Sequence, residues 1–383
     1  MTDATIDPNH RFHAFVREDL IAPQPPPRNM VGPVAWMRSR LFSTPLDAIL
    51  TVLGVAAIAY ILWTLVSFAF IGATWSGEDG DACRKHLNGA CWPFIGAYWK
   101  TFIYGRYPIE ERWRVDCVAI AFFALLVPLA IPSVKGKLIN ALLFIFVLPI
   151  FALLMLGGGV FGLASVETSY WGGLTVTLVI AVTGIVASIP LGILLALGRR
   201  SKLPIIKLFS VMYIEFWRGV PLITVLFMAT NLLPLFLPDG VTIDKLLRAL
   251  IGVTLFTAAY MAETIRGGLQ AIPRGQYEGA MALGIGYWRA MALVIMPQAL
   301  KLVIPGIVGS CISLFKDTSL VSIVGLTDLL STVQSSGTDA RWASPTTMNS
   351  GYLVATIIYF TFCFAMSRYS QYTEQRLNTG HKR

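Results

Sequence analysis

Charged side chains are scarce in this sequence. Asp, Glu, Lys and Arg make up 13% of its 383 residues, whereas hydrophobic residues make up 55%, and soluble domains carry about 25% charge. The mean hydropathy is +0.66. Such a composition excludes a disordered chain, because this much apolar surface would collapse or insert into a membrane. It predicts a polytopic membrane protein.

Histidine is also rare, and this limits the chemistry of the chain. The four histidines, His10, His13, His86 and His381, all lie outside the long apolar runs. No H-E-x-x-H metal site or histidine relay can therefore be built in the membrane. No P-loop motif is present, so the chain has no ATPase site of that kind. We expect no catalytic residues and no metal site.

Long apolar runs recur along the chain. A bilayer core of roughly 30 Å needs about 20 apolar residues per helix. Eight runs qualify, which predicts an all-α fold of about eight membrane spans. The fifth run contains Pro221 and Pro234 and is expected to begin as a surface helix and enter the membrane near Gly219. The eight runs are 46–73, 115–131, 138–156, 171–197, 208–237, 246–264, 296–314 and 350–367.

Basic residues indicate the orientation of these spans. The net charge is +9, but Lys and Arg occur in short clusters between apolar runs, a pattern of membrane topology rather than of nucleic-acid binding. Most of them fall on the inner side if both termini are cytoplasmic. The exception is the long outer loop 74–114, and long loops determine topology weakly. We predict a bacterial inner membrane protein with cytoplasmic tails at 1–45 and 372–383.

Two segments outside the spans have distinct compositions. Residues 23–27 read Pro-Gln-Pro-Pro-Pro, an extended polyproline stretch. This stretch either docks a partner or belongs to a solvated linker. The outer loop 74–114 is rich in aromatic residues and suits a small folded cap. Cys83 and Cys91 lie in this loop, where an oxidising periplasm permits a disulfide. The alternative is two free thiols.

An organised inner segment lies between the sixth and seventh runs. Pro273 can open a helix, because its missing N–H costs nothing in the first turn. Gly284 can end this helix, because glycine accepts the left-handed conformation. The enclosed helix of about eleven residues is too short and polar to span a membrane. It is expected to lie on or protrude from the inner face.

The same segment resembles the signature loop of permease subunits of ABC importers. That loop reads E-A-A, three residues, G, nine residues, I-x-L-P, and this chain has Glu278-Gly279-Ala280, then Gly284, then Val294-Ile-Met-Pro297 at the same intervals. Gly279, Val294 and Met296 depart from the pattern but keep small or apolar residues. The resemblance implies a coupling helix that docks on a separate ATPase subunit. The alternative is a surface amphipathic helix without a partner.

Further motifs resemble the polar amino acid uptake branch of this family. They are Tyr213–Leu222, Ala259–Gly268, Gly275-Gln276, Pro297-Gln298-Ala299 and Lys316–Leu320. With three more spans before it, the whole resembles most the M-type permease of general L-amino acid transporters, or the related glutamate and aspartate systems. The resemblance implies a type I permease domain of five helices at 170–371, preceded by an extension of three spans at 46–169.

The resemblance also implies a function and partners. It implies an importer of polar L-amino acids, built from ATPase subunits, a second and homologous permease, a periplasmic binding protein and this chain. ATP and Mg²⁺ would bind the ATPase, and no cofactor would bind this chain. The alternative is a secondary amino acid transporter or channel without an ATPase. That class would need inverted repeats or broken helices around its site, and it does not explain the inner loop.

Charged residues inside the runs suggest a substrate path. Glu215 and Arg218, like Glu263 and Arg266, are spaced to pair on one helix face. A polar amino acid needs donors for its carboxylate and acceptors for its ammonium. We therefore predict a substrate path lined by these residues, unless the charges are structural ion pairs. Arg218 and Lys316 are the candidates for the carboxylate, Glu263 and Asp317 for the ammonium or side chain, and Thr318 and Ser319 for neutral hydrogen bonds.

Overall fold

The computed structural model describes residues 32–85, 88–131, 133–238 and 240–377. It divides the chain into two units, Met1–Ser67 and Phe68–Arg383. Within the described residues the regular elements are helices, with isolated bridges in place of strands. This confirms the predicted all-α class. The polyproline stretch at 23–27 and the last residues of the C-terminal tail lie outside the described residues.

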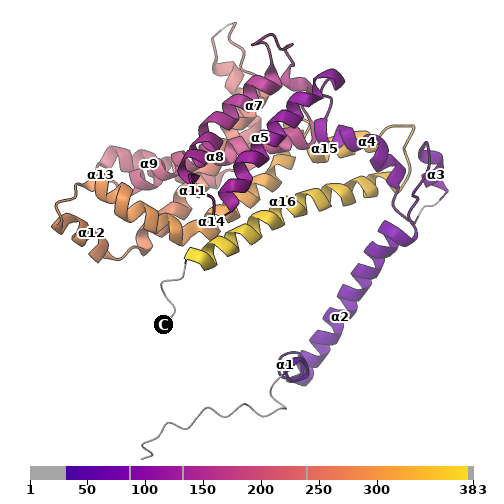
Figure 1. The fold of residues 1–383 in the computed structure, drawn as a ribbon, viewed down its shortest axis with the longest axis horizontal. Coiled ribbons are helices and arrows are strands. Elements are labelled where there is room, and N and C mark those ends of the chain that lie inside the picture. The colour runs from indigo at the N-terminus through magenta and orange to yellow at the C-terminus, as the bar shows by residue number, and fades with distance from the viewer. Residues whose placement is uncertain (1–31, 86–87, 132, 239, 378–383) are drawn as a thin grey trace, which may run out of the picture. The chain divides into compact units, whose positions relative to one another are not determined.

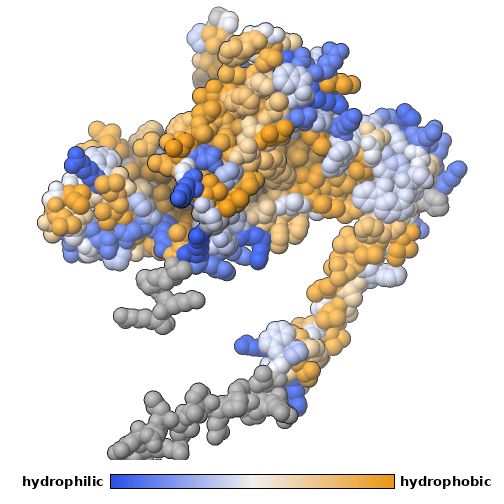
Figure 2. Space-filling model, in the orientation of Figure 1, coloured by the Kyte–Doolittle hydropathy of each residue, from blue (hydrophilic) through white to orange (hydrophobic). Residues whose placement is uncertain are grey.

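The first unit contains a short helix and a long apolar one. Helix α1 spans Pro33–Arg40 and α2 spans Pro45–Val66. A capping box starts α2, because the Thr44 hydroxyl accepts from the Asp47 N–H at 3.1 Å and the Asp47 carboxylate accepts from the Thr44 N–H at 3.2 Å. Figure 2 shows hydrophobic side chains over α2. A helix that is apolar all round is suited to lipid contact.

The second unit begins with the outer loop and two further apolar helical segments. The loop 74–114 is folded, as expected, and carries helices instead of an irregular chain. Figure 2 shows hydrophobic side chains on the outward surface of α5 and α7, which fits a lipid-facing position. The elements are α3 (Gly80–Arg84), α4 (Trp92–Tyr104), η3 (Ile109–Glu111), α5 (Arg112–Ala130), α6 (Lys137–Leu142), η4 (Leu143–Val147), α7 (Leu148–Gly157) and η5 (Thr168–Tyr170).

A core of longer helices completes the second unit. Helix α11 lies at its centre and packs against α8, α9 and α14. The elements are α8 (Gly173–Arg199), α9 (Pro204–Gly219), α10 (Leu222–Phe227), η6 (Met228–Leu232), η7 (Leu233–Phe236), α11 (Lys245–Ala271), α12 (Arg274–Ala282), α13 (Tyr287–Ala290), η8 (Met291–Ile295), α14 (Met296–Asp317), η9 (Thr318–Val324), α15 (Leu329–Gly337) and α16 (Thr347–Leu377).

Small residues let α11 approach its neighbours closely. A Cβ atom at Gly192 of α8 would lie 2.7 Å from the Cβ of Met261, and one at Gly268 of α11 would lie 2.6 Å from the carbonyl oxygen of Ala299 in α14. Only glycine fits at these two contacts. Small residues at helix crossings are typical of membrane proteins, where packing replaces the hydrophobic effect between helices.

The described helices account for all eight predicted spans. Seven are long and apolar enough to cross a membrane, and one bent pair supplies the eighth. Several run past the apolar runs into polar sequence, because hydropathy marks the lipid-facing length of a helix and not its ends. The seven are Pro45–Ile71, Ile109–Ala130, Lys137–Gly157, Gly173–Arg199, Lys245–Ala271, Tyr287–Val324 and Thr347–Leu377.

The bent pair is the fifth predicted run. Pro204–Gly219 and Leu222–Phe236 meet at 105°, which confirms the expected change of direction near Gly219. Pro221 cannot donate to the helix and disfavours a helical residue before it. Val220 is accordingly extended, with φ −106° and ψ 134°.

Candidate functional site

The inner segment forms a short helix at one end of the second unit. Figure 1 shows α12 and α13 at this end, and α3, α4 and α15 at the other. Pro273 is the N-cap residue directly before α12, and the helix covers the nine residues Arg274–Ala282. It ends earlier than predicted, because Leu283 already leaves helical geometry. Gly284 then takes the left-handed conformation with φ +69°, as its position after the helix requires.

Four of the five predicted coupling residues are exposed. Only Ala280 is buried, which anchors α12 to its own subunit, and the exposed residues are Glu278, Gly279, Gly284 and Pro297. A Cβ atom at Gly279 would meet nothing within 4 Å. The face that contains Glu278 and Gly279 is therefore open to another molecule.

Large apolar side chains surround this open face. Met281 is 66% exposed, Leu283 79% and Trp288 72%. Met281 lies on α12, Leu283 directly follows it and Trp288 lies on α13, so all three are outside the long apolar helices. Clustered apolar exposure of this kind marks an interaction surface.

Side chains from two neighbouring helices hold α12 in place. One guanidinium nitrogen of Arg200, just after α8, donates to the Leu269 carbonyl at 2.7 Å and to the Tyr277 hydroxyl at 3.1 Å. The Gln298 amide of α14 donates to the Gln276 side-chain oxygen at 3.0 Å. Hydrogen bonds thus connect α12 to Arg200, just after α8, and to α14.

A charged cluster joins three helices close to α12. Arg199, at the end of α8, bonds Glu215 of α9 at 2.8 Å and Glu263 of α11 at 3.1 Å. The Nε of Arg266 donates to Glu263 at 2.7 Å. Arg199, Glu263 and Arg266 are all at least two-thirds buried. The predicted pair of Glu263 and Arg266 is therefore present and extended by a third residue.

The predicted pair of Glu215 and Arg218 is wrong. Glu215 turns to Arg199 instead, and the Arg218 guanidinium lies over the Tyr260 ring, 5.8 Å from its centroid. Arg218 is the penultimate residue of α9, next to the break at Pro221, so its side chain reaches α11 without a carboxylate partner on its own helix. An arginine over an aromatic face is attracted by the ring quadrupole.

The other predicted path residues lie at the far end of α14. Lys316 is exposed and Asp317 half-buried, and together they end the helix. The buried Thr318 hydroxyl donates to the Phe315 carbonyl at 2.8 Å, and the Ser319 hydroxyl to the Lys316 carbonyl at 2.9 Å.

The structure does not bring all the predicted path residues together, because Arg218 and Glu263 form one set and Lys316, Asp317, Thr318 and Ser319 form another. Gly306 of α14 faces Thr264, whose methyl group would lie 2.8 Å from a Cβ there. Glu263 is therefore level with Gly306, about ten residues before Lys316. At 1.5 Å per residue, roughly 15 Å of α14 separates the two sets.

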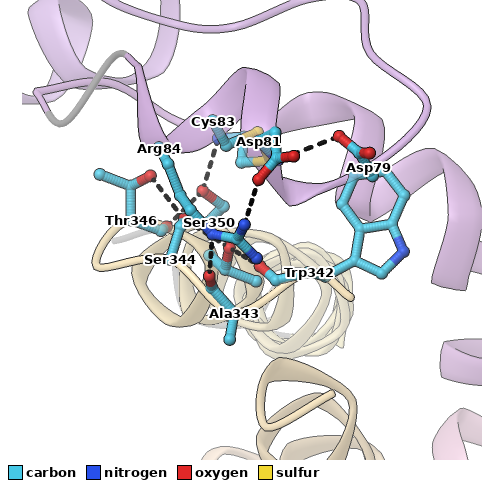
Figure 3. Close-up of a disulfide and its surroundings, with 11 residues drawn as sticks. Asp79, Asp81, Cys83, Arg84, Trp342, Ala343, Ser344, Thr346 and Ser350 are labelled. Carbon is cyan, nitrogen blue, oxygen red and sulfur yellow. Dashed lines mark hydrogen bonds and ion pairs between the residues drawn. A yellow bond between two sulfur atoms is a disulfide. The ribbon is translucent and has the colours of Figure 1, made fainter. Parts of the chain in front are cut away.

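A disulfide secures the opposite end of the second unit. Cys83 and Cys91 are joined, with their Cα atoms 5.6 Å apart. Figure 3 shows Arg84 beside this bridge, and its Nε donates to the Ala343 carbonyl at 2.9 Å. The Cys91 N–H donates to the Ser350 hydroxyl at 2.8 Å. These bonds attach the loop 74–114 to the start of α16.

A tyrosine strengthens the same attachment. The Tyr98 hydroxyl of α4 donates to the Asp339 carboxylate after α15. Burial, followed by the bond to Asp339, raises the pKa of Tyr98 to about 12. The same bond lowers the pKa of Asp339. In the part of the chain that the structure describes, no group of three or more His, Cys, Asp or Glu residues could hold a metal ion.

The fold and these features define a membrane-embedded subunit that has an exposed helix for a partner. A family model described as "Binding-protein-dependent transport system inner membrane component" matches residues 188–379. The chain belongs to this family, and it is a permease subunit of an ABC importer, not a secondary transporter or channel.

Relatives match over nearly the whole chain. The inner membrane amino-acid ABC transporter permease protein YhdY of Escherichia coli K12 is 49% identical over 364 residues, 94% of this chain and 96% of that protein. The glutamate/glutamine/aspartate/asparagine transport system permease protein BztC of Rhodobacter capsulatus is 40% identical over 435 residues, 96% of this chain and 99% of that protein. A solved amino acid ABC transporter is 31% identical over 53% of this chain and 92% of that chain, with a TM-score of 0.47.

Sequence reasoning missed Arg199 and Arg200 as site residues. They are adjacent basic residues at the end of an apolar run, and this position indicated only membrane orientation. Their contacts with Glu263 and Leu269 join positions more than 60 residues apart. One signal could have found them. Arg199 and Arg200 lie at the predicted inner end of their apolar run, and Glu215 and Glu263 lie at the predicted inner ends of theirs.

Proposed function

We propose that this chain is the permease subunit of an ATP-driven importer of polar L-amino acids. The observation that carries the proposal is the similarity to YhdY and BztC over nearly the full length of each chain. Both of those proteins are described as permeases for amino acids. The importer would contain ATPase subunits that bind ATP and Mg²⁺, a second and homologous permease, and a periplasmic binding protein.

The α12 segment is the proposed ATPase contact. Its exposed apolar side chains and the open face at Glu278 and Gly279 support this role. Ala280 anchors the helix, while Gly284 and Pro297 set its end and the start of α14. The bonds from Arg200 and Gln298 carry the movement of α12 to α8 and α14.

The proposed substrate path follows α11 and α14. Its inner level contains Arg218 and Glu263, and its outer level contains Lys316, Asp317, Thr318 and Ser319. Charges of both signs at the inner level suit a zwitterion, and the Arg218 guanidinium, which interacts electrostatically with Glu263, forms no close ion pair in the described residues. Two separated levels favour successive contacts rather than one site.

The proposed orientation places α12 in the cytoplasm. Both termini are then cytoplasmic, and the disulfide-bonded loop 74–114 is periplasmic, where an oxidising environment preserves the bridge. In this arrangement 1–45 and 372–383 are cytoplasmic tails, 46–169 is the extension and 170–371 is the permease domain.

Copurification and uptake test the proposal. The tagged chain is expressed with the ATPase, permease and binding protein genes of its own source, purified and reconstituted in liposomes. We expect the ATPase to copurify and labelled L-glutamate or L-glutamine to accumulate only with ATP and binding protein. Uptake without ATP, or absence of the ATPase from the purified complex, contradicts the proposal.

A further inference from the structure

A cavity of about 490 Å³ lies at the end of the core opposite α12. Lys245 begins α11 at this cavity, whereas Ala271 ends α11 next to α12. Arg106 and residues 166–169, which precede the five-helix permease domain, form one side of the wall together with Trp171 at the start of that domain. Asp244, Lys245 and the turn at Gly325 form the other side. With α12 in the cytoplasm, the cavity faces the periplasm.

Two cations line this cavity. Arg106 is exposed and donates one guanidinium N–H to the Ser169 carbonyl at 3.2 Å, which leaves its other donors available. Lys245 is exposed too, and its ammonium lies beside the Gly325 backbone, 2.8 Å from where a Cβ atom would be. In the described residues no hydrogen bond or ion pair engages the Lys245 ammonium. The wall therefore has donors for an anionic group.

Two carboxylates line the same space. Glu167 accepts the Ser169 hydroxyl at 3.2 Å. Asp244 caps α11 with one oxygen, which accepts the N–H groups of Leu246 at 2.8 Å and Leu247 at 3.1 Å, and its other oxygen accepts the Thr168 hydroxyl. No ion pair joins either carboxylate to Arg106 or Lys245 among the described residues. The cavity thus holds both signs of charge without an ion pair between them.

A buried donor on the wall points to a ligand. Trp171 is 3% exposed, and its indole N–H has no acceptor among the described residues. Its backbone is fixed, because the Trp171 N–H donates to the Thr168 carbonyl at 3.1 Å and the Thr327 hydroxyl donates to the Trp171 carbonyl at 3.1 Å. Leaving a buried donor unpaired is costly. The indole nitrogen is itself covered, so the ring has to turn toward the cavity before a bound oxygen atom can supply the missing acceptor.

We propose that this cavity binds the zwitterionic head group of a free amino acid on the periplasmic side of the permease. Arg106, Lys245 and the Trp171 indole face the α-carboxylate, and Glu167 and Asp244 face the ammonium. The choice of an amino acid rests on the proposed function. The cavity gives the segment before the permease domain a role, since that segment provides Arg106 and Glu167.

Ligand binding to the assembled transporter tests this assignment. The full complex without binding protein is placed in nanodiscs, and equilibrium binding of tritiated L-glutamine and L-glutamate is measured. Arg106→Gln is expected to raise Kd by roughly 10-fold or more, since hydrogen bonds to charged groups contribute about 1.5–3 kcal/mol. Arg106→Lys should retain more of the affinity. Trp171→Phe keeps an aromatic ring but removes the indole N–H, and should raise Kd several-fold.

Two controls separate this site from general charge effects. Lys100→Gln removes an exposed charge from α4 without touching the cavity, and its Kd should equal that of the parent. L-Glutaminamide lacks the carboxylate and 4-carbamoylbutanoate lacks the ammonium. Both should compete at least 10-fold more weakly than L-glutamine.

Failure of the cavity assignment can be distinguished from failure of the proposed function. Equal affinity for parent, Arg106→Gln and Trp171→Phe, or no binding by the parent, overturns the cavity assignment even if ATP-driven uptake is normal. Absence of uptake and of the ATPase contradicts the proposed function instead. Size-exclusion profiles of each variant complex confirm that a loss of affinity is not a loss of assembly.

Discussion

The Arg199 guanidinium bonds the Glu263 carboxylate across 3.1 Å, although 64 residues separate them in the sequence. The bond ties the end of α8 to α11. Because Arg199 also bonds Glu215, one side chain links three helices at the end of the core where α12 lies.

Removing this link should loosen the core. Arg199→Gln is expected to lower the free energy of unfolding by about 1–2 kcal/mol, because Glu263 loses one of its two partners in a mostly buried place. Glu215 adds little, since it is more than half exposed and water screens it. Thermal unfolding of the solubilised complex measures the change. The matched control is Glu215→Gln, and equal stability of Arg199→Gln and parent would contradict the expectation.

Neutral substitutions of Arg218 and Glu263 should both reduce uptake but should differ in their effect on stability. Arg218→Gln removes a cation that lies over Tyr260 and forms no close ion pair in the described residues, so uptake should fall while most of the stability is retained. Glu263→Gln strips Arg199 and Arg266 of a shared carboxylate, so uptake and stability should both fall. Proteoliposome uptake and thermal unfolding are measured on the same preparations. Unchanged transport and selectivity in both variants would show that these charges are structural.

The α12 contact is tested by charge reversal. Glu278→Lys should leave the chain inserted and folded, because the side chain is exposed, but should abolish ATP-driven uptake through repulsion at the ATPase surface. Lys100→Gln is the control, because it removes an exposed charge on α4, away from α12. Copurified ATPase and stimulated ATP hydrolysis are the measurements. Normal uptake by Glu278→Lys would refute the docking role of α12.

We predict that the disulfide between Cys83 and Cys91 stabilises the attached outer loop, so that loss of the bridge loosens this loop. Thiol labelling of the denatured, non-reduced protein should leave Cys83 and Cys91 unlabelled. The chain-entropy model assigns so short a loop about 2–3 kcal/mol of local stabilisation. The variant with Ser at both positions should therefore be cleaved faster by protease between α3 and α4. Full labelling of both cysteines would show that the bridge is absent.

The length of the apolar runs predicted the spans, because a lipid-facing helix must be apolar along its length. The break at Gly219 was also predictable, since Pro221 acts on the residues beside it. The ends of α11 and α14 were not, because residues such as Glu263 and Arg266 continue a helix without continuing its apolar pattern.

The candidate site was predicted only where it depends on neighbours in sequence. Glu263 and Arg266 pair across one helical turn, and the α12 residues keep their spacing. Arg199 and the Trp171 cavity arise from helix packing between distant segments, so spacing along the chain carries no signal for them. The wrong pairing of Glu215 with Arg218 has the same cause, since turn spacing permits a pair but does not exclude a stronger partner on another helix.

The close contacts at Gly192 and Gly268 constrain how such a permease can work. Where a backbone touches a neighbouring helix with no side chain between them, neither sliding nor rotation is possible without a gap or a collision. Helices α8, α11 and α14 therefore move as one rigid unit. The change between inward-facing and outward-facing states must then occur where this unit meets other parts of the transporter. We expect cross-links among these three helices to leave transport intact and cross-links to a second permease to stop it.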